Sequence, residues 1–396
     1  MKTVAEAWAL LGAEIPALGP EEVELSRARG RILRVDVLAD TDQPPFARSA
    51  MDGYLVRLGE AQNVLRVTGE VAPGAGARMP GAGTAIRVFT GSAVPEEGAA
   101  VVIQEEVDRD GEFIRLRSVP RSGYIRPRGS HARRGDLLVA AGTRLSPGPI
   151  ALLAASGVSR PMVSPVVRVS HLATGRELVD HGVEPGVGQI RDTNSPMVAA
   201  LVRGSGAAMV WQGRVDEDPA ALMAALAPAI EAEPHILLIS GGASVGDHDH
   251  TAGVLRDAGF KILVHGVAVR PGKPLIVARR ARLLAFCLPG NPLSHFTSFH
   301  LFVRRAMAHL CGEEPARTLR LPVEEVSEMP GHPRETWWPC QLVNASGRLL
   351  ARPLAWRDSS DITSLARVEG LLRVPPDGIG PADIAEVLMT AFILEL

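Results

Sequence analysis

Carboxylates, cations and glycine-rich turns gather in residues 236–294 of this 396-residue sequence. The first turn follows a short apolar run and precedes a helical pattern, so its backbone N–H groups are expected beside the positive end of a helix dipole. Such a loop can receive a phosphate or another oxyanion. The candidate ligand-binding residues of this turn are Gly241, Gly242, Ser244, Gly246 and Asp247, and the candidate reactive carboxylate Asp249 follows them.

Two more turns lie in the same stretch. Arg270 and Lys273 bracket the second turn, and two cations so close together in the chain suit an anionic ligand. The third turn contributes Pro289, Gly290, Asn291 and Ser294. Loops at the carboxyl ends of parallel strands gather at one edge of a doubly wound sheet, so the three turns together predict one binding face.

Three further polar residues outside these turns are Asp52, Thr90 and Glu177. Each has an ordinary structural explanation, as a turn carboxylate bonded to its own backbone, a turn cap and a solvated loop charge. Asp218 precedes a proline in the pattern of a helix cap, which explains it at least as well as metal binding does.

The elements that must position these residues alternate between strand and helix from residue 166 onward. Short apolar runs predict strands over 166–169, 207–212, 236–239, 262–269, 275–278 and 283–286. Helices are predicted over 196–202 with Asn194 as cap, 218–232, 251–258 with Gly259 as its end, and 291–310. This alternation is typical of a doubly wound α/β sheet.

The flanking regions have other patterns. Residues 3–13 predict a short amphipathic helix in which Thr3 and Glu6 have capping-box spacing. Short alternating runs split by glycine and proline predict β structure on both sides of the α/β region. We therefore predict an α/β multidomain protein with flanking β-rich domains. Its predicted parts are a linker or helical domain of 1–40 with 142–165, a β-rich domain of 41–141, an α/β domain of 166–314 and a small C-terminal β domain of 315–396.

Composition excludes several classes of protein. The formal net charge of −2 offers no basic field for nucleic acid, so any anion site must be local. The three cysteines are far apart and outside any C-x-x-C spacing, which argues against a disulfide framework and a zinc site. No apolar run is long enough to span a bilayer, and no signal-peptide pattern follows the first helix. We expect a cytoplasmic protein without nucleic-acid or membrane partners.

The three turns resemble the signature loops of the molybdopterin-binding domain, in SGGASVGD (240–247), PGKP (271–274) and LPGNP (288–292). Together with PPFARSAMDGY (44–54) and TGSAVP (90–95), they resemble the molybdopterin molybdenumtransferases, the family that includes the C-terminal enzyme domain of gephyrin. The resemblance covers nearly the whole chain. It implies a molybdopterin-binding α/β domain and insertion of molybdenum from molybdate into adenylated molybdopterin, with release of AMP.

The resemblance also implies roles for single residues. The glycine turns would hold the phosphates of the adenylated pterin, and Arg270, Lys273 and Ser294 would contact molybdate. The implied Mg²⁺ ligands are Asp52, Glu177 and Asp249, and the implied catalytic groups add Thr90, Arg270 and Lys273. In the family the region around Asp52 is supplied across a dimer, so a homodimer is expected. An upstream molybdopterin adenylyltransferase and recipient molybdoenzymes are the implied protein partners.

Three departures from the family pattern leave a rival hypothesis open. Arg48 replaces a common asparagine, Gly266 and Arg270 stand where two lysines are common, and residues 337–340 lack an expected basic residue. A planar guanidinium and a compact ammonium hold a tetrahedral oxyanion differently. The alternative is therefore a diverged pterin-binding paralogue or scaffold with weak or no catalysis, or an enzyme with a raised molybdate requirement. A third hypothesis, the adenylyltransferase of the preceding step, conflicts with the motif around Asp52, because that enzyme resembles only the α/β domain.

Overall fold

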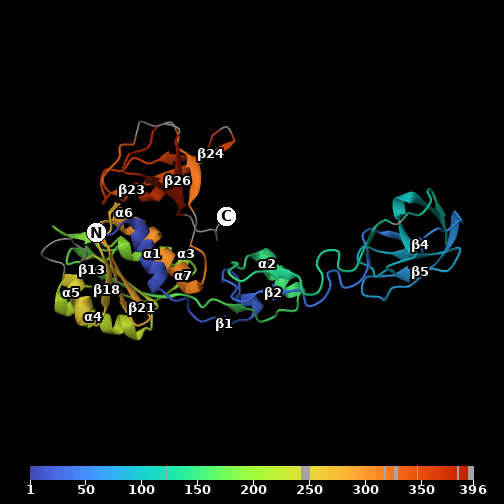
Figure 1. Ribbon diagram of the computed structural model, residues 1–396, viewed down its shortest axis with the longest axis horizontal. Coiled ribbons are helices and arrows are strands. Elements are labelled where there is room, and N and C mark those ends of the chain that lie inside the picture. Colours follow the sequence, from blue (N-terminus) through green and yellow to red (C-terminus); the bar gives the residue numbers. More distant parts are fainter. Residues whose placement is uncertain are drawn as a thin grey trace. The chain divides into compact units, whose positions relative to one another are not determined.

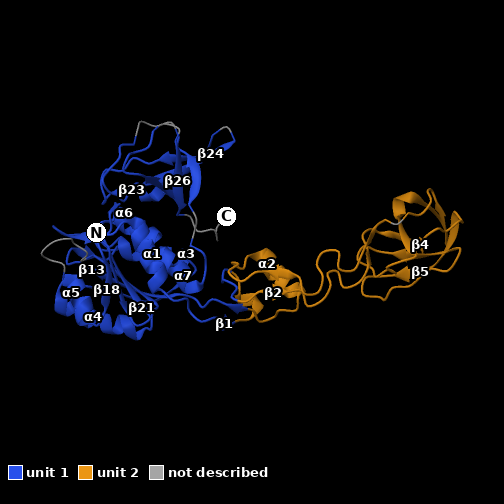
Figure 2. Cartoon of the chain, in the orientation of Figure 1, with its two compact units in different colours: residues 1–22, 30–34, 162–396 blue, residues 23–29, 35–161 orange. Residues whose placement is uncertain are grey.

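The computed structural model of the chain describes residues 1–121, 123–241, 250–315, 318–324, 329–345, 347–380 and 383–390. The chain forms two compact units (Figure 2). Unit 1 comprises residues 1–22, 30–34 and 162–396, and unit 2 comprises residues 23–29 and 35–161. The finer division into four parts remains a prediction.

A six-stranded mixed sheet organises unit 1 (Figure 1). Its order is β16-β13-β17-β21-β20-β18. The strands are β13 (Arg168–Thr174), β16 (Ala208–Val215), β17 (Ile236–Ser240), β18 (Lys261–His265), β20 (Ile276–Arg280) and β21 (Leu283–Leu288). The first four strands of this order run parallel, whereas β20 and β18 join them as antiparallel neighbours. The carboxyl ends of the four parallel strands therefore lie at one edge, as predicted.

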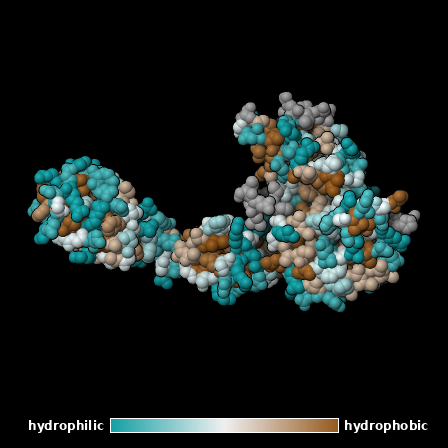
Figure 3. Space-filling model, turned by 180° about the vertical axis from the view of Figure 1, so that it is seen from behind, coloured by the Kyte–Doolittle hydropathy of each residue, from teal (hydrophilic) through white to brown (hydrophobic). Residues whose placement is uncertain are grey.

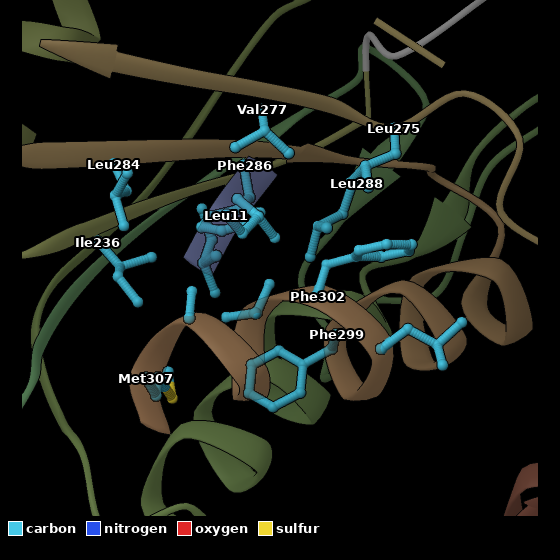
Figure 4. Packing of buried hydrophobic residues seen from close by; sticks show 14 of the residues in the cluster. Leu11, Ile236, Leu275, Val277, Leu284, Phe286, Leu288, Phe299, Phe302 and Met307 are labelled. Carbon is cyan, nitrogen blue, oxygen red and sulfur yellow. The ribbon is translucent and has the colours of Figure 1, made fainter. Parts of the chain in front are cut away.

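Helices cover both faces of this sheet. They are α1 (Val4–Glu14), α3 (Asn194–Gly204), α4 (Pro219–Glu231), α5 (His250–Asp257), α6 (Pro292–Ser298), its π-helical continuation (Phe299–Val303) and α7 (Arg304–Cys311). Ile236 and Leu238 of β17 pack in the cluster with α1, α3 and α7, whereas Leu237 and Ile239 pack in the cluster with α4 and α5. Figure 4 shows part of the first cluster, which includes Phe299 of the π-helical segment and residues of the sheet. The predicted doubly wound α/β architecture is thus confirmed.

Local sequence signals fix several helix ends as predicted. Thr3 accepts a hydrogen bond from the backbone N–H of Glu6, and the Glu6 carboxylate accepts one from the backbone N–H of Thr3, which completes the capping box. Oδ2 of Asp218 accepts the backbone N–H of Ala221 at 2.9 Å, so Asp218 caps α4. Gly259 follows α5 with a left-handed φ of 85°.

A second six-stranded sheet contains the C-terminal strands. Its order is β19-β23-β25-β26-β22, with β24 paired to β23. The strands are β19 (Val269–Arg270), β22 (Leu319–Pro322), β23 (Glu335–Ala345), β24 (Arg348–Pro353), β25 (Gly370–Val374) and β26 (Ile384–Met389). The prediction of one strand over 262–269 is wrong. Gly266, at a left-handed φ of 80°, separates β18 in the first sheet from β19 in the second.

Unit 2 is built on a third six-stranded sheet, of order β7-β4-β6-β5-β9-β8. Its strands are β4 (Gly53–Arg57), β5 (Val64–Val71), β6 (Thr84–Val88), β7 (Ala99–Ile103), β8 (Val107–Asp110) and β9 (Phe113–Leu116). Unit 2 also contains two short pairs, β2 (Val37–Leu38) with β11 (Leu137–Val139) and β3 (Arg48–Ser49) with β10 (Ile125–Arg126), and helix α2 (Pro147–Ala155). Two further short pairs belong to unit 1: β1 (Glu21–Glu22) with β12 (Met162–Val163), and β14 (Leu178–Val179) with β15 (Ile190–Arg191).

The surface is mostly hydrophilic on the face shown in Figure 3, and hydrophobic residues lie there in separate groups. Within the described ranges, no helix combines the length and apolar character needed to cross a membrane.

Candidate active site

A cavity of about 660 Å³ in unit 1 adjoins the ends of β13, β17 and β21. The structure brings eight of the predicted site residues to its wall: Glu177, Gly241, Arg270, Lys273, Pro289, Gly290, Asn291 and Ser294. A second cavity of about 520 Å³ adjoins the first and shares Glu177, Gly241, Gly290 and Asn291 with it. Described residues of all three turns therefore line one cavity, and ligand binding there remains a prediction.

The first turn requires glycine where it leaves β17. Gly241 has a φ of 93°, and a Cβ there would lie 2.4 Å from the carbonyl oxygen of Thr174. The hydroxyl of Thr174 donates to the carbonyl oxygen of Ser240 at 3.3 Å, which ties the end of β13 to the end of β17. Glu177 lies on the loop after β13, with its carboxylate against Gly175: a Cβ on that glycine would be 2.7 Å from Oε1.

The second turn brings two cations to the cavity. Arg270 belongs to β19 and is joined to Pro271 by a cis peptide bond. Its Cζ lies 5.2 Å from the ring centroid of Trp356, which is a cation–π distance. Lys273 lines the cavity beside Arg270. Gly266 is not among the described residues that line it.

Side chains from distant segments hold the third turn. Nδ2 of Asn291 donates to Oγ of Ser359 at 2.7 Å, and Nδ2 of Asn194 donates to the carbonyl oxygen of Gly290 at 2.7 Å. The prediction that Asn194 caps α3 is therefore wrong, because the turn uses its side chain. Oδ1 of Asp192 instead accepts a backbone N–H at the start of α3, at 2.9 Å.

His295 supports the same turn from within the core. It is fully buried, and its Nδ1 is 3.2 Å from the carbonyl oxygen of Pro289. Burial lowers the pKa of His295 to about 4, against smaller raising effects of that hydrogen bond and of Asp192. The imidazole is therefore neutral near pH 7, and Nδ1 must carry the proton because a carbonyl oxygen can only accept.

The C-terminal β region supplies part of the wall that the sequence reasoning missed. This region contributes Arg334, Trp356, Arg357, Asp358 and Ser359, and Glu217 joins the wall from the loop between β16 and α4. Nη1 of Arg334 donates to the carbonyl oxygen of Val269 at 3.3 Å, so this cation is tied to the backbone just before Arg270. Residues 357–361 are a run of charged and hydroxyl side chains, which signals a turn. Their spacing alone does not connect them to turns so much earlier in the chain.

Among the described residues, the cavity wall carries four cations and three carboxylates. The cations are Arg270, Lys273, Arg334 and Arg357, and the carboxylates are Glu177, Glu217 and Asp358. Hydrogen bonds from the hydroxyl and backbone of Ser360 hold the pKa of Asp358 below its ordinary value, so Asp358 is ionised near pH 7. These four cations beside polar turns fit a negatively charged ligand.

In unit 2 the structure joins Asp52 to Thr90. Oδ1 of Asp52 accepts hydrogen bonds from the backbone N–H of Thr90 at 2.7 Å and from its hydroxyl at 2.9 Å. These bonds hold the pKa of Asp52 below its ordinary value. The structural explanation of Asp52 as a carboxylate that bonds to backbone is thus correct. Its partner, however, is the backbone N–H of Thr90 and not the backbone of its own turn.

The structure describes only two of the three predicted Mg²⁺ ligands, Glu177 and Asp52. In the described part of the chain, no group of three or more histidine, cysteine or acidic side chains could hold a metal ion. Glu177 lines the cavity in unit 1, and Asp52 belongs to unit 2. Gly242, Ser244, Gly246, Asp247 and Asp249 lie outside the described residues. Because Mg²⁺ commonly takes one or two carboxylates and completes its shell with substrate phosphates and water, Glu177 fits such a site with a phosphorylated ligand.

Three stretches of the chain match known families. Residues 2–157 match the MoeA N-terminal region (domain I and II), residues 170–309 match a probable molybdopterin binding domain, and residues 325–386 match the MoeA C-terminal region (domain IV). The matches extend well beyond the α/β region on both sides. The adenylyltransferase hypothesis, which concerns that region alone, is therefore not supported.

Similar proteins from several organisms share one name. A molybdopterin molybdenumtransferase of Bacillus subtilis is 34% identical over 373 residues, which are 90% of this chain and 86% of that protein. One from Nostoc is 37% identical over 306 residues, which are 74% of this chain and 70% of that protein. The crystal structure of a molybdopterin biosynthesis moeA protein from Pyrococcus horikoshii OT3 matches with a TM-score of 0.82 at 28% identity, and covers 98% of this chain and 100% of that one. The chain belongs to the molybdopterin molybdenumtransferase family.

Proposed function

We propose that this chain inserts molybdenum from molybdate into adenylated molybdopterin and releases AMP. The observation that carries the proposal is the cavity in unit 1, where three polar turns and four cations line one space. A doubly phosphorylated adenylate and a molybdate dianion are ligands of the charge that this wall suits. The name of the relatives from Bacillus subtilis and Nostoc supports the same activity here.

The lining cations have complementary roles in this proposal. Arg270 and Lys273, with the hydroxyl of Ser294, would contact molybdate. Arg334 and Arg357 would add positive charge that was not predicted from the sequence. This charge would compensate for the lysine that is common in the family where this chain has Gly266.

Magnesium is part of the proposal. Glu177 would hold the ion together with phosphate oxygens of the substrate, and Asp249 and Asp52 remain candidate ligands. When bound, the ion would neutralise charge on the phosphoanhydride and polarise it toward cleavage. Without the ion, the Glu177 carboxylate would repel the phosphates, so Glu177 should matter more to AMP release than to pterin binding.

The proposed assembly is a homodimer, because the family is expected to supply the region around Asp52 across a dimer. The Asp52–Thr90 pair, with its fixed and ionised carboxylate, is the feature of unit 2 that would serve the reaction. The class of reaction that supplies the substrate is adenylylation of molybdopterin, and recipient molybdoenzymes would take the product.

Reconstitution of active cofactor tests the proposal. The purified chain with adenylated molybdopterin, Mg²⁺ and molybdate should yield cofactor that activates a molybdenum-free molybdoenzyme. Lys273→Ala should abolish most of this activity. Arg282→Ala, which removes an exposed cation from the turn between β20 and β21, should not.

The same experiment separates the alternatives. Binding of the adenylated pterin without active cofactor would support the diverged pterin-binding paralogue. Failure to bind the pterin at all would reject both functions.

A further inference from the structure

Three side chains behind the second cavity form one hydrogen-bonded chain. Nε2 of Gln212, on β16, is 3.0 Å from Nδ1 of His171, on β13. Nε2 of His171 is 2.6 Å from Oγ of Ser240, the last residue of β17. His171 is fully buried and Ser240 is 2% exposed. Gln212 is exposed and lies on β16, the edge strand of the sheet. The chain therefore runs from the edge of the sheet to the residue directly before the first glycine turn.

The direction of the hydrogen bonds can be assigned. Nε2 of Gln212 also donates to the carbonyl oxygen of Ser195 at 3.1 Å, and a carbonyl can only accept. The amide is thereby oriented with its NH₂ group toward Nδ1 of His171, so Nδ1 accepts. Burial lowers the pKa of His171 to about 3, so the ring is neutral near pH 7 and carries its single proton on Nε2. His171 therefore donates to the oxygen of Ser240.

This direction leaves the proton of the Ser240 hydroxyl available. Ser240 lines the cavity of about 520 Å³, together with Gly241 and Asn291 of the turns. Within the described residues, no acceptor for the Ser240 hydroxyl is found besides the ring that already donates to it. Because the hydroxyl oxygen of Ser240 accepts from His171, the hydroxyl proton remains to be donated to another acceptor, and Ser240 lines a cavity in which a ligand could supply one.

We infer that His171 is a positioning residue, which together with Gln212 keeps the Ser240 hydroxyl as a hydrogen-bond donor to an oxygen of the bound adenylated pterin. The inference rests on the proposed function for the identity of the ligand. It does not depend on catalysis, because the hydroxyl serves binding. In a buried chain each donor polarises the next, so the last hydroxyl is a better donor than an isolated serine.

Gln212→Glu tests the inference without touching the cavity. The substitution keeps the size of an exposed side chain but replaces the donor by an acceptor, so Nδ1 should take the proton and Nε2 should accept. The Ser240 hydroxyl would then donate backward to His171. We expect about tenfold weaker binding of adenylated molybdopterin, the loss that follows from one hydrogen bond to a charged group.

Gln212→Met is the matched control. It removes the donor without imposing an acceptor, so both tautomers of His171 become allowed. If they are equally populated, half of the molecules keep the binding-competent hydroxyl, and the dissociation constant should rise only about twofold. Measurement at low and high salt separates a reversed hydrogen bond, which salt leaves nearly unchanged, from charge repulsion by the new carboxylate, which salt screens.

Nitrogen NMR of the ligand-free chain gives a readout that does not depend on the pterin. The wild type should show His171 neutral with its proton on Nε2, and Gln212→Glu should move the proton to Nδ1. Ser240→Ala should weaken binding as much as Gln212→Glu, and the two together should weaken it no further, because both act through one hydroxyl.

Separate results overturn the inference and the function. A wild-type His171 protonated on Nδ1, or additive losses in the double variant, would overturn the inference while the function stands. A wild type that binds no adenylated pterin would overturn the function, and the inference with it.

Discussion

Arg270 is held at the cavity by an aromatic ring and by its place in β19. The cation–π contact with Trp356 fixes the guanidinium without neutralising it, so its charge remains available to an anion. We predict that Arg270→Ala raises the molybdate concentration for half-maximal cofactor formation about ten- to hundredfold, the cost of one charge-assisted hydrogen bond. A molybdate titration at fixed pterin measures this. An unchanged half-saturation point would place the oxyanion elsewhere, and Arg282→Ala is the control for loss of a cation.

His295 gives the fold a dependence on acid. Its pKa in the folded chain, about 4, lies below the ordinary value of 6.5, so the unfolded chain binds the proton more readily. The stability that neutral His295 contributes is complete above about pH 6.5 and is lost as the pH falls through about 4. We predict that His295→Gln, which keeps a donor for Pro289, reduces the slope of unfolding free energy against pH in this window by up to about 1.4 kcal/mol per pH unit. Urea unfolding from pH 4.5 to 7 measures the slope, and equal slopes in both proteins would contradict the prediction.

At the scale of elements, the turn after β17 requires a glycine, Gly241, in its first position. Gly241→Ala would place a Cβ against the carbonyl oxygen of Thr174 at a backbone conformation that favours glycine. We predict that this variant loses pterin binding and on the order of 1–3 kcal/mol of stability. Gly253→Ala is the control, because Gly253 lies within α5 and no described atom would lie within 4 Å of a Cβ there, so alanine should stabilise the helix. Retained binding in Gly241→Ala would show that the turn tolerates another path.

The elements also show what a sequence can and cannot predict. Strands such as β17 and β21 and the cap at Asp218 follow from local patterns, because short apolar runs and capping residues act within a few positions. The family resemblance places Glu177, Arg270 and Lys273 on one cavity, and the structure does so too. Other features are contacts between segments far apart in the sequence. They are the pairing of β19 with β23 in the C-terminal sheet, the hydrogen bond from Asn194 to Gly290, and the position of Trp356 in the cavity wall. No periodicity encodes them, so they needed the structure.

At the scale of the whole molecule, the central prediction is a dimer. The cavity belongs to unit 1 and the Asp52–Thr90 pair to unit 2, and both regions carry motifs of one family. We predict that sedimentation at micromolar concentration gives a mass of about twice the 42.0 kDa of one chain. A monomer with full activity would contradict a site completed by two protomers.

The release of AMP tests the account most directly. The purified chain, given adenylated molybdopterin and Mg²⁺, should release AMP in a reaction that requires molybdate, in amounts equal to the molybdenum inserted. Glu177→Ala should lose most of this release while it still binds the pterin. Asp218→Ala, which removes only the cap of α4, should keep its activity and lose about 1 kcal/mol of stability. AMP release that needs no molybdate, or that survives intact in Glu177→Ala, would contradict the proposal that this cavity couples molybdate to the adenylated pterin.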